Sequence, residues 1–193
     1  MAKSKLNHDI GSLLETPRYY ECYSALANNR IIFISEDISK STAAELSAML
    51  LYYDEVNEAE DINIYINTNG GDAAALSQIF DIMQIIHAPI KTICFGKAYS
   101  AGAYMLSAGT KGKRLMTRNS SVMIHGIQAN LPPADQKKSE IYFNFLKDHN
   151  RKILEILAKN TGRTVEQIEK DCEKDLYMDA EEAVKYGIVD DII

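Results

Sequence analysis

The sequence is poor in residues that mark several common protein classes. It has no tryptophan, four prolines and three cysteines among its 193 residues. The cysteines, Cys22, Cys94 and Cys172, are far apart and form no Cys-x-x-Cys pair. A disulfide framework and a structural zinc site are therefore not expected, and no metal site is predicted. This sparse use of cysteine is typical of a reducing, cytoplasmic compartment.

Long apolar runs and clusters of positive charge are also missing. No segment approaches the roughly 18 consecutive apolar residues that would predict a membrane-spanning helix. The polar start, MAKSKLNHDIGS, has no apolar stretch behind it and does not resemble a signal peptide. The net charge is −6, and no stripe of Lys and Arg suits a phosphate backbone. We therefore expect no membrane and no nucleic acid among the partners.

What remains is the balance of an ordinary globular domain. Hydrophobic residues make up 46% of the chain and charged residues 25%, which is typical of folded soluble domains. The length predicts one domain that buries roughly 70% of its unfolded surface. We expect a short N-terminal arm over residues 1–17 and a single domain over residues 18–193.

From residue 31 onward, short β-rich runs alternate with amphipathic helical stretches. This alternation predicts an α/β fold of βαβ units around a largely parallel sheet. The predicted strands are Ile31–Ser35, Ile62–Asn67, Ile90–Phe95, Val122–His125 and a terminal Ile188–Val189. The predicted helices are Ser41–Asn57 (with Ser41 as N-cap), Ala73–Ile86, Ser100–Ala108, Ser139–Lys159, Thr164–Lys174 and Asp179–Tyr186, the last two capped by Thr164 and Asp179.

A serine stands where one of these strands meets a helix of small residues. In GKAYSAGAYMLSAG, Ser100 follows an apolar strand and opens a stretch rich in Ala and Gly. The free N–H groups of a first helical turn favour developing negative charge, so Ser100 is a candidate nucleophile. The commoner role for such a serine is an N-cap. The segment is not a GxSxG elbow, because position 98 is Ala.

A second loop, Asn69-Gly70-Gly71, follows the preceding strand. Two glycines permit positive φ and close approach of the backbone to a ligand. Its amides suit a phosphate, an extended peptide or an oxyanion, although an ordinary tight turn explains the glycines equally well. Both loops are expected at the same ends of neighbouring parallel strands, where α/β folds build their sites.

A nucleophilic serine needs a base, and the sequence offers four histidines. His8 lies in the polar arm, His87 at a helix end, and His149 on a charged helix that we expect to be solvated. His125 ends the apolar strand SVMIH before Gly126, which makes it the best base by position and by elimination.

A third member, a carboxylate, is needed to orient the imidazole. The run EKDCEKDLYM holds Asp171, Glu173 and Asp175, and the pattern of residues leaves the choice among them open.

Four segments together resemble the ClpP family, the proteolytic subunits of the ATP-dependent Clp protease. They are INTNGGDAAALSQIFDIMQII, ICFGKAYSAGAYMLSAGTKGKR, NSSVMIHG and TGRTVEQIEKDCEKDLYMDAEEAVKYGIVDDI, in family order over residues 18–193. The resemblance implies a crotonase-like spiral of ββα units with a projecting handle at about residues 127–160. It implies a serine endopeptidase whose nucleophile is Ser100 and whose base is His125. It also implies Asp175 as the triad carboxylate and the Gly71 and Ala101 amides as the oxyanion hole, with Asn69 and Gly70 in the substrate-strand loop.

The resemblance further implies an assembly. Family members form heptameric rings that stack as a tetradecamer, and an AAA+ unfoldase of the Clp/Hsp100 class feeds unfolded polypeptides into the chamber. The unfoldase uses the ATP, so no cofactor is expected on this chain.

Several positions depart from the family pattern. Thr68-Asn69 replaces the usual Ser-Pro, Ala101 replaces Met, and Gly126-Ile127 replaces Gln-Pro after the histidine. Asn63 stands where a docking-pocket aromatic is usual, and Lys174 replaces an arginine. These departures favour a divergent member, phage-encoded or a paralogue. The alternatives are a catalytically silent or regulatory ring subunit, and an acyl-CoA-binding crotonase, which would rely on carboxylates rather than on a serine and a histidine.

Overall fold

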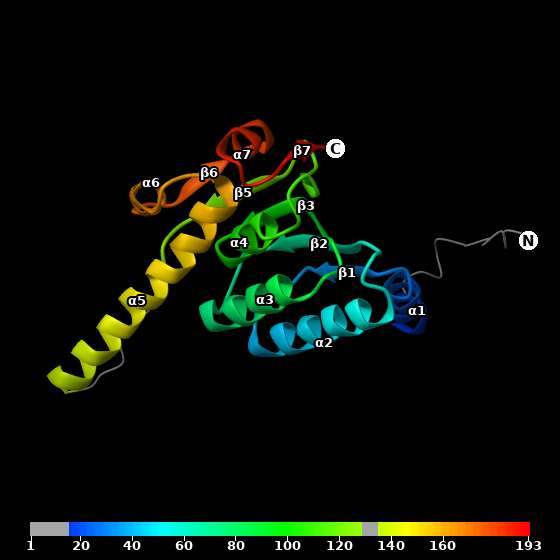
Figure 1. Cartoon of the computed structure of the whole chain (residues 1–193), viewed down its shortest axis with the longest axis horizontal. Helices are drawn as coiled ribbons and strands as arrows, with labels where there is room; N and C mark the ends of the chain where they lie inside the picture. The colour runs from blue at the N-terminus through cyan, green and yellow to red at the C-terminus, as the bar shows by residue number, and fades with distance from the viewer. Residues whose placement is uncertain (1–15, 129–134) are drawn as a thin grey trace, which may run out of the picture.

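The computed structural model of the chain describes residues 16–128 and 135–193, which fold into a mixed α/β architecture (Figure 1). The helices are α1 (Thr16–Ala27), α2 (Lys40–Val56), α3 (Ala73–Ile85), α4 (Ala101–Ser107), α5 (Gln136–Thr161), α6 (Val165–Asp171) and α7 (Ala180–Tyr186). The strands are β1 (Ile31–Ile34), β2 (Ile62–Thr68), β3 (Ile90–Tyr99), β4 (Arg114–Met116), β5 (Ser121–Ile124), β6 (Leu176–Met178) and β7 (Asp191–Ile192).

The sheet is largely parallel, which confirms the expectation from the alternating pattern. Its strands run in the order β1-β2-β3-β4-β7, and every pair in this path is parallel. The long strand β3 pairs with β4 over Thr92–Cys94 and then with β5 over Lys97–Tyr99. β6 joins the far side of β5 and is antiparallel to it.

Alternation along the strands decides which face is buried. In β2, Ile62, Ile64 and Ile66 are fully buried, while the residues between them are half-buried. Helices α2 and α3 lie side by side over one face of β1–β3, and α4 packs against β3 (Figure 1). The other face carries an aromatic cluster in which Phe33 stacks on Tyr65 at 5.2 Å between ring centroids. Phe95 packs edge-on against both rings.

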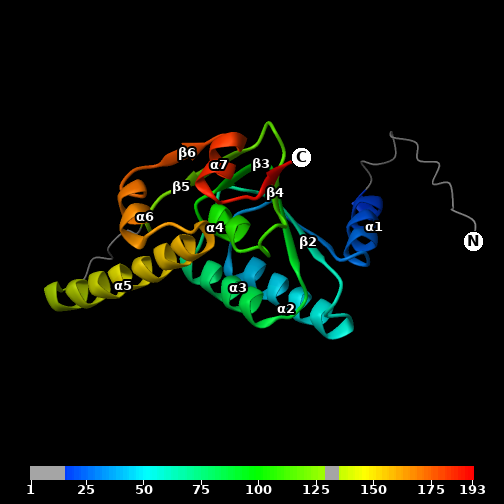
Figure 2. The ribbon, with the colours of Figure 1, turned by 45° about the horizontal axis from the view of Figure 1, so that its top comes forward.

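Helix α5 projects from the body, and its two halves have different surroundings (Figures 1 and 2). The C-terminal half buries Ile153, Leu154 and Leu157 in the core. The N-terminal half leaves large apolar side chains exposed, with Ile141 at 70% and Phe145 at 60%. The helix corresponds to the predicted stretch Ser139–Lys159 but begins three residues earlier, because Asp135 caps it by accepting the N–H of Lys138.

Two local predictions from the sequence are wrong. The N-cap of α2 is Ser39 and not Ser41, because Ser39 has extended backbone and its Oγ accepts the N–H of Thr42. Ser41 lies inside the helix and donates to the Glu45 carboxylate. The terminal strand is β7 rather than Ile188–Val189, whose side chains are buried behind the αL residue Gly187 that ends α7. The caps predicted at Thr164 and Asp179 are confirmed.

The predicted arm, residues 1–17, lies outside the described residues except for the start of α1, and so does part of the predicted handle region, residues 129–134. In the part that the structure describes, no helix is long and apolar enough to span a membrane. Nor do residues 16–128 and 135–193 gather three or more metal-binding His, Cys, Asp or Glu side chains in one place.

Candidate active site

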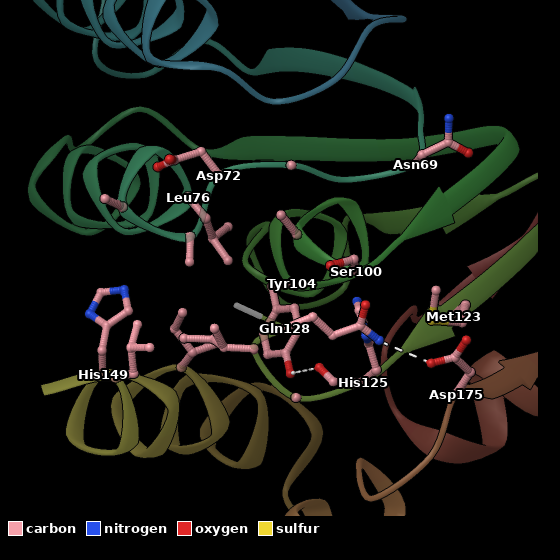
Figure 3. A pocket seen from close by; sticks show the side chains of 18 of the residues that line it. Asn69, Asp72, Leu76, Ser100, Tyr104, Met123, His125, Gln128, His149 and Asp175 are labelled. Atoms are coloured by element: carbon pink, nitrogen blue, oxygen red, sulfur yellow. Dashed lines mark hydrogen bonds and ion pairs between the residues drawn. The ribbon is translucent and has the colours of Figure 1, made fainter. Parts of the chain in front are cut away.

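Three strand ends meet at one edge of the sheet and bring the predicted residues together. Gly70 and Gly71 follow β2, Ser100 follows β3, and His125 follows β5. β3 pairs in parallel with both β2 and β5. The carboxyl ends of the three strands therefore lie at the same edge of the sheet. Gly71, Ser100 and His125 line one cavity of about 600 Å³ (Figure 3).

Ser100 is held in a backbone conformation that residues other than glycine rarely adopt. Its φ is 51° and its ψ is −124°, and among the described residues Arg30 is the other non-glycine residue with positive φ. Such strain persists only where the surroundings enforce it, and it concentrates at functional sites. Here the Ser100 N–H donates to the Met123 carbonyl at 2.8 Å, which ties the turn to β5. Ser100 occupies the N-cap position of α4, but its side chain makes no capping hydrogen bond.

The glycine loop lies directly against this serine. A Cβ added at Gly70 would stand 2.7 Å from the Ser100 Cβ and 2.7 Å from the Tyr99 carbonyl oxygen, so only glycine permits this approach. The Ile38 N–H donates to the Gly70 carbonyl at 2.7 Å, and the Asp72 N–H donates to the Ile38 carbonyl at 2.8 Å. In a parallel bridge of this kind, the N–H of the intervening residue, Gly71, points away from Ile38, and Gly71 itself lines the cavity.

His125 is only 14% exposed and faces a carboxylate. Its Nδ1 is buried and, within the part of the chain that the structure describes, has no hydrogen-bond partner. The nearest anionic atom is Oδ1 of Asp175 at 3.7 Å, which is ion-pair range but longer than a hydrogen bond (Figure 3).

The other two carboxylates of the run have different surroundings. Asp171 accepts a hydrogen bond from the Tyr186 hydroxyl at 2.8 Å and another from Gln167. Glu173 is exposed. Of the three carboxylates that the sequence left open, Asp175 is thus the one in ion-pair range of His125, and it also lines the cavity.

The main chain around His125 is fixed by three hydrogen bonds. The Tyr104 hydroxyl of α4 donates to the His125 carbonyl at 3.1 Å, and the Gly126 N–H donates to the Cys172 carbonyl at 3.2 Å. The Ile127 N–H donates to Oδ1 of Asn150 on α5 at 2.7 Å. Sequence reasoning missed Tyr104 and Asn150, because a contact with backbone between distant elements leaves no local pattern.

The prediction that His149 lies on a solvated helix face is wrong. Its side chain is half-buried, lines the cavity and approaches Oγ of Ser77 to 3.5 Å. The helix is charged, but His149 lies one turn after Phe145, and its imidazole stacks on the Phe145 ring. His87 lies beyond α3 beside Asp54 and Glu58, away from the cavity, and His8 lies outside the described residues.

The buried thiols are poor nucleophiles. Burial raises the pKa of Cys94 to about 12 and that of Cys172 to about 11. A thiol with such a pKa carries almost no thiolate near neutrality. Neither thiol lines the cavity, and among the described residues that do, Ser100 is the one Ser, Thr, Cys or Lys.

A comparison with known protein families finds a match over nearly the whole chain. The family model described as Clp protease matches residues 14–193, a span that includes all of the cavity.

Proposed function

The chain belongs to the Clp protease family, and within it we propose a serine endopeptidase that cleaves unfolded polypeptides with Ser100, His125 and Asp175. The family itself implies peptidase activity. The observation that carries the finer assignment is the buried Nδ1 of His125, which has no hydrogen-bond partner among the residues that the structure describes and faces Asp175 in the cavity that Ser100 also lines.

The facing carboxylate decides which imidazole nitrogen carries the proton. With Asp175 on the Nδ1 side, the favoured neutral tautomer has its proton on Nδ1, because that N–H points towards the carboxylate. Nε2 is then left as a free base for the Ser100 hydroxyl. The imidazolium formed during the reaction is stabilised by the same carboxylate.

Two backbone amides are the proposed oxyanion hole. The Gly71 N–H points away from its bridge partner Ile38, and Gly71 lines the cavity. Ala101 also lines the cavity and provides the first N–H of α4, which has no acceptor within its own helix. One such donor is worth about 3 kcal/mol of transition-state stabilisation. Both donors are backbone atoms, so the replacement of the usual Met by Ala101 leaves the hole intact.

The reaction proceeds in two balanced halves. Ser100 Oγ attacks the peptide carbonyl while His125 Nε2 takes its proton, and the oxyanion lies at the Gly71 and Ala101 amides. The C–N bond then breaks, the leaving amine takes the proton from His125, and an ester to Ser100 remains. Water attacks that ester, gives one proton to His125 and releases the acid, and Ser100 recovers its proton.

The distance of 3.7 Å between His125 Nδ1 and Asp175 Oδ1 must shorten before the two groups form a hydrogen bond. Asp175 is 45% exposed, so a small movement can close the hydrogen bond when another surface covers it. We propose that self-association into heptameric rings, stacked as a tetradecamer, supplies that surface. The exposed apolar side chains of α5 support such association, because apolar patches of this kind mark interfaces.

An AAA+ unfoldase that feeds polypeptides to the chamber completes the proposal. Threading requires ATP, which this partner would use, and no cofactor is proposed on the chain itself. The half-buried aromatic cluster of Phe33, Tyr65 and Phe95 is a candidate docking point, with Asn63 in place of a further aromatic.

Fluorophosphonate labelling tests the nucleophile directly. The probe forms a P–O bond to an activated serine and expels fluoride, and mass spectrometry then maps the modified residue. We expect labelling at Ser100 in the wild-type protein and in a Ser41→Ala control, whose serine is exposed and does not line the cavity, but not in Ser100→Ala. The protein is fractionated by size first, so that the labelled fraction identifies the competent assembly. Absence of label from every fraction would contradict the proposal and favour a silent or regulatory subunit.

A further inference from the structure

The charged side chains at the wall of the candidate active-site cavity are of one sign. Among the described residues that line it, Asp72 and Asp175 are acidic, and none is a lysine or an arginine. Asp175 is in ion-pair range of His125, so its charge is already engaged. Within the same described part of the chain, Asp72 has no cationic partner. The cavity therefore presents one uncompensated carboxylate to whatever enters it.

Asp72 directly follows the glycine loop and caps helix α3. Its Oδ1 accepts the N–H of Ala75 at 2.8 Å. This cap requires one acceptor oxygen and no negative charge, since Asn and Ser cap helices about as well as Asp. In residues 16–128 and 135–193, no hydrogen bond occupies the second oxygen, Oδ2, and the residue is exposed. Oδ2 is thus free to accept a charge-assisted hydrogen bond from a cation in the cavity.

The chemistry of the proposed reaction indicates which part of a substrate passes Asp72. His125 must reach the leaving amine, so the leaving side of the scissile bond lies towards His125 and Asp175. Figure 3 shows Asp72 on the opposite side of Ser100 from Asp175. The residues on the acyl side of the scissile bond, P1 and those before it, therefore lie towards Asp72.

We propose that Asp72 is a specificity-determining residue that selects substrates with lysine or arginine on the acyl side of the scissile bond. The head group of such a side chain pairs with Oδ2. Its long aliphatic stem lies along apolar side chains of the cavity such as Leu76, as the stems of basic residues commonly do. A glutamate in the same place is repelled by the carboxylate. This inference rests on the proposed peptidase function.

Internally quenched peptides that differ only in lysine or norleucine at one position isolate the charge, because norleucine has the same stem without the ammonium group. The exchange is made in turn at P1, P2 and P3, and at P1′ and P2′ on the leaving side. For the wild-type protein at low salt, we expect kcat/KM to favour lysine by about two- to fivefold at an acyl-side position, as for a partly exposed ion pair. The preference should fall towards unity in roughly 1 M salt, which screens such a pair.

Two variants of α3 that lose the same charge test the assignment to Asp72. Asp72→Asn keeps an acceptor for the Ala75 N–H, so it should fold, as its melting temperature would show, and should lose the preference for lysine. Asp81→Asn removes a carboxylate from an exposed position of the same helix that does not line the cavity, and should keep the preference. A preference that survives in Asp72→Asn, or that falls equally in both variants, would overturn the proposal.

Fluorophosphonate labelling of Ser100 separates the two levels of inference. If Ser100 is labelled and the peptides are cleaved without a preference for lysine, the specificity proposal fails and the peptidase assignment stands. The same holds if lysine is preferred on the leaving side alone. If no variant is labelled and no peptide is cleaved, both proposals fail together.

Discussion

Replacing Gly70 with alanine should damage the site through a contact that can be followed atom by atom. Gly70 has a φ of +103°, which residues with a side chain rarely adopt. The new Cβ would stand 2.7 Å from both the Ser100 Cβ and the Tyr99 carbonyl oxygen, and 2.9 Å from the Ala101 nitrogen. These atoms belong to Ser100, the proposed nucleophile, and to the turn that provides one proposed oxyanion donor.

Two effects contribute to the expected magnitude. The unfavourable φ costs about 1–3 kcal/mol of folding stability. To restore an ordinary carbon–carbon separation, the loop and the serine must also move apart by roughly 0.8 Å. A displacement of about 1 Å in a catalytic arrangement costs on the order of 100-fold in rate. We therefore expect Gly70→Ala to remain folded at 25 °C and to lose about 100-fold in kcat.

A matched glycine separates strain from contact. Gly112 also has positive φ, +85°, but a Cβ there would meet nothing within 4 Å. Gly112→Ala should lose a similar amount of stability from the φ alone and keep its activity. The assay combines kcat on a fluorogenic peptide with the rate of fluorophosphonate labelling and the melting temperature. Equal losses of activity in the two variants, or full activity in Gly70→Ala, would refute the reasoning.

Three further predictions follow from the buried polar groups. Tyr104→Phe removes the donor to the His125 carbonyl and should cost about 1 kcal/mol of unfolding free energy with a lower kcat, measured by thermal melts and peptide hydrolysis. Asp190 is partly buried, which by itself raises its pKa, but hydrogen bonds and charge from Arg114 outweigh this and lower the pKa overall. The stability it contributes is therefore present above the ordinary carboxyl range near pH 4 and is lost as the pH falls through its lowered pKa. Urea titrations should show Asp190→Asn destabilised by about 3–5 kcal/mol at pH 7, with a gap that narrows in acid; a constant gap would exclude the ion pair as its source. In the native protein at pH 7.5, iodoacetamide should modify the exposed Cys22 and spare the two buried cysteines until urea is added, as peptide mapping would show.

The sheet could be predicted from the sequence because its signals are local. The alternation of INIYIN and the break at Gly70-Gly71 locate β2 and its loop within one residue. The short strands β4 and β6 were missed, since three residues carry too little periodicity. They exist because β3 and β5 offer unpaired edges, and only the assembled sheet provides those edges.

The candidate site divides in the same way. Ser100 and His125 could be placed at strand ends from the sequence, and parallel pairing then brings those ends together. The choice among Asp171, Glu173 and Asp175 depends on how the segment after α6 returns alongside β5, which is a matter of tertiary packing. The position of His149 at the cavity was hidden for a related reason, because a charged helix looks solvated until the helix that packs against it is known.

Helix α5 projects from the molecule and also lines the candidate active-site cavity (Figure 1). At about 1.5 Å per residue its 26 residues span roughly 39 Å. The helix is thus a long rigid element that is anchored where its C-terminal half enters the core. Its outer arm, the N-terminal half, carries the exposed apolar side chains. Nearer the core, Asn150 of the same helix accepts the N–H of Ile127, two residues after the proposed base His125. We therefore expect a contact that displaces the outer arm of α5 to move the backbone beside His125. Substitutions of Ile141 or Phe143, whose exposed side chains do not line the cavity, should change turnover as well as association.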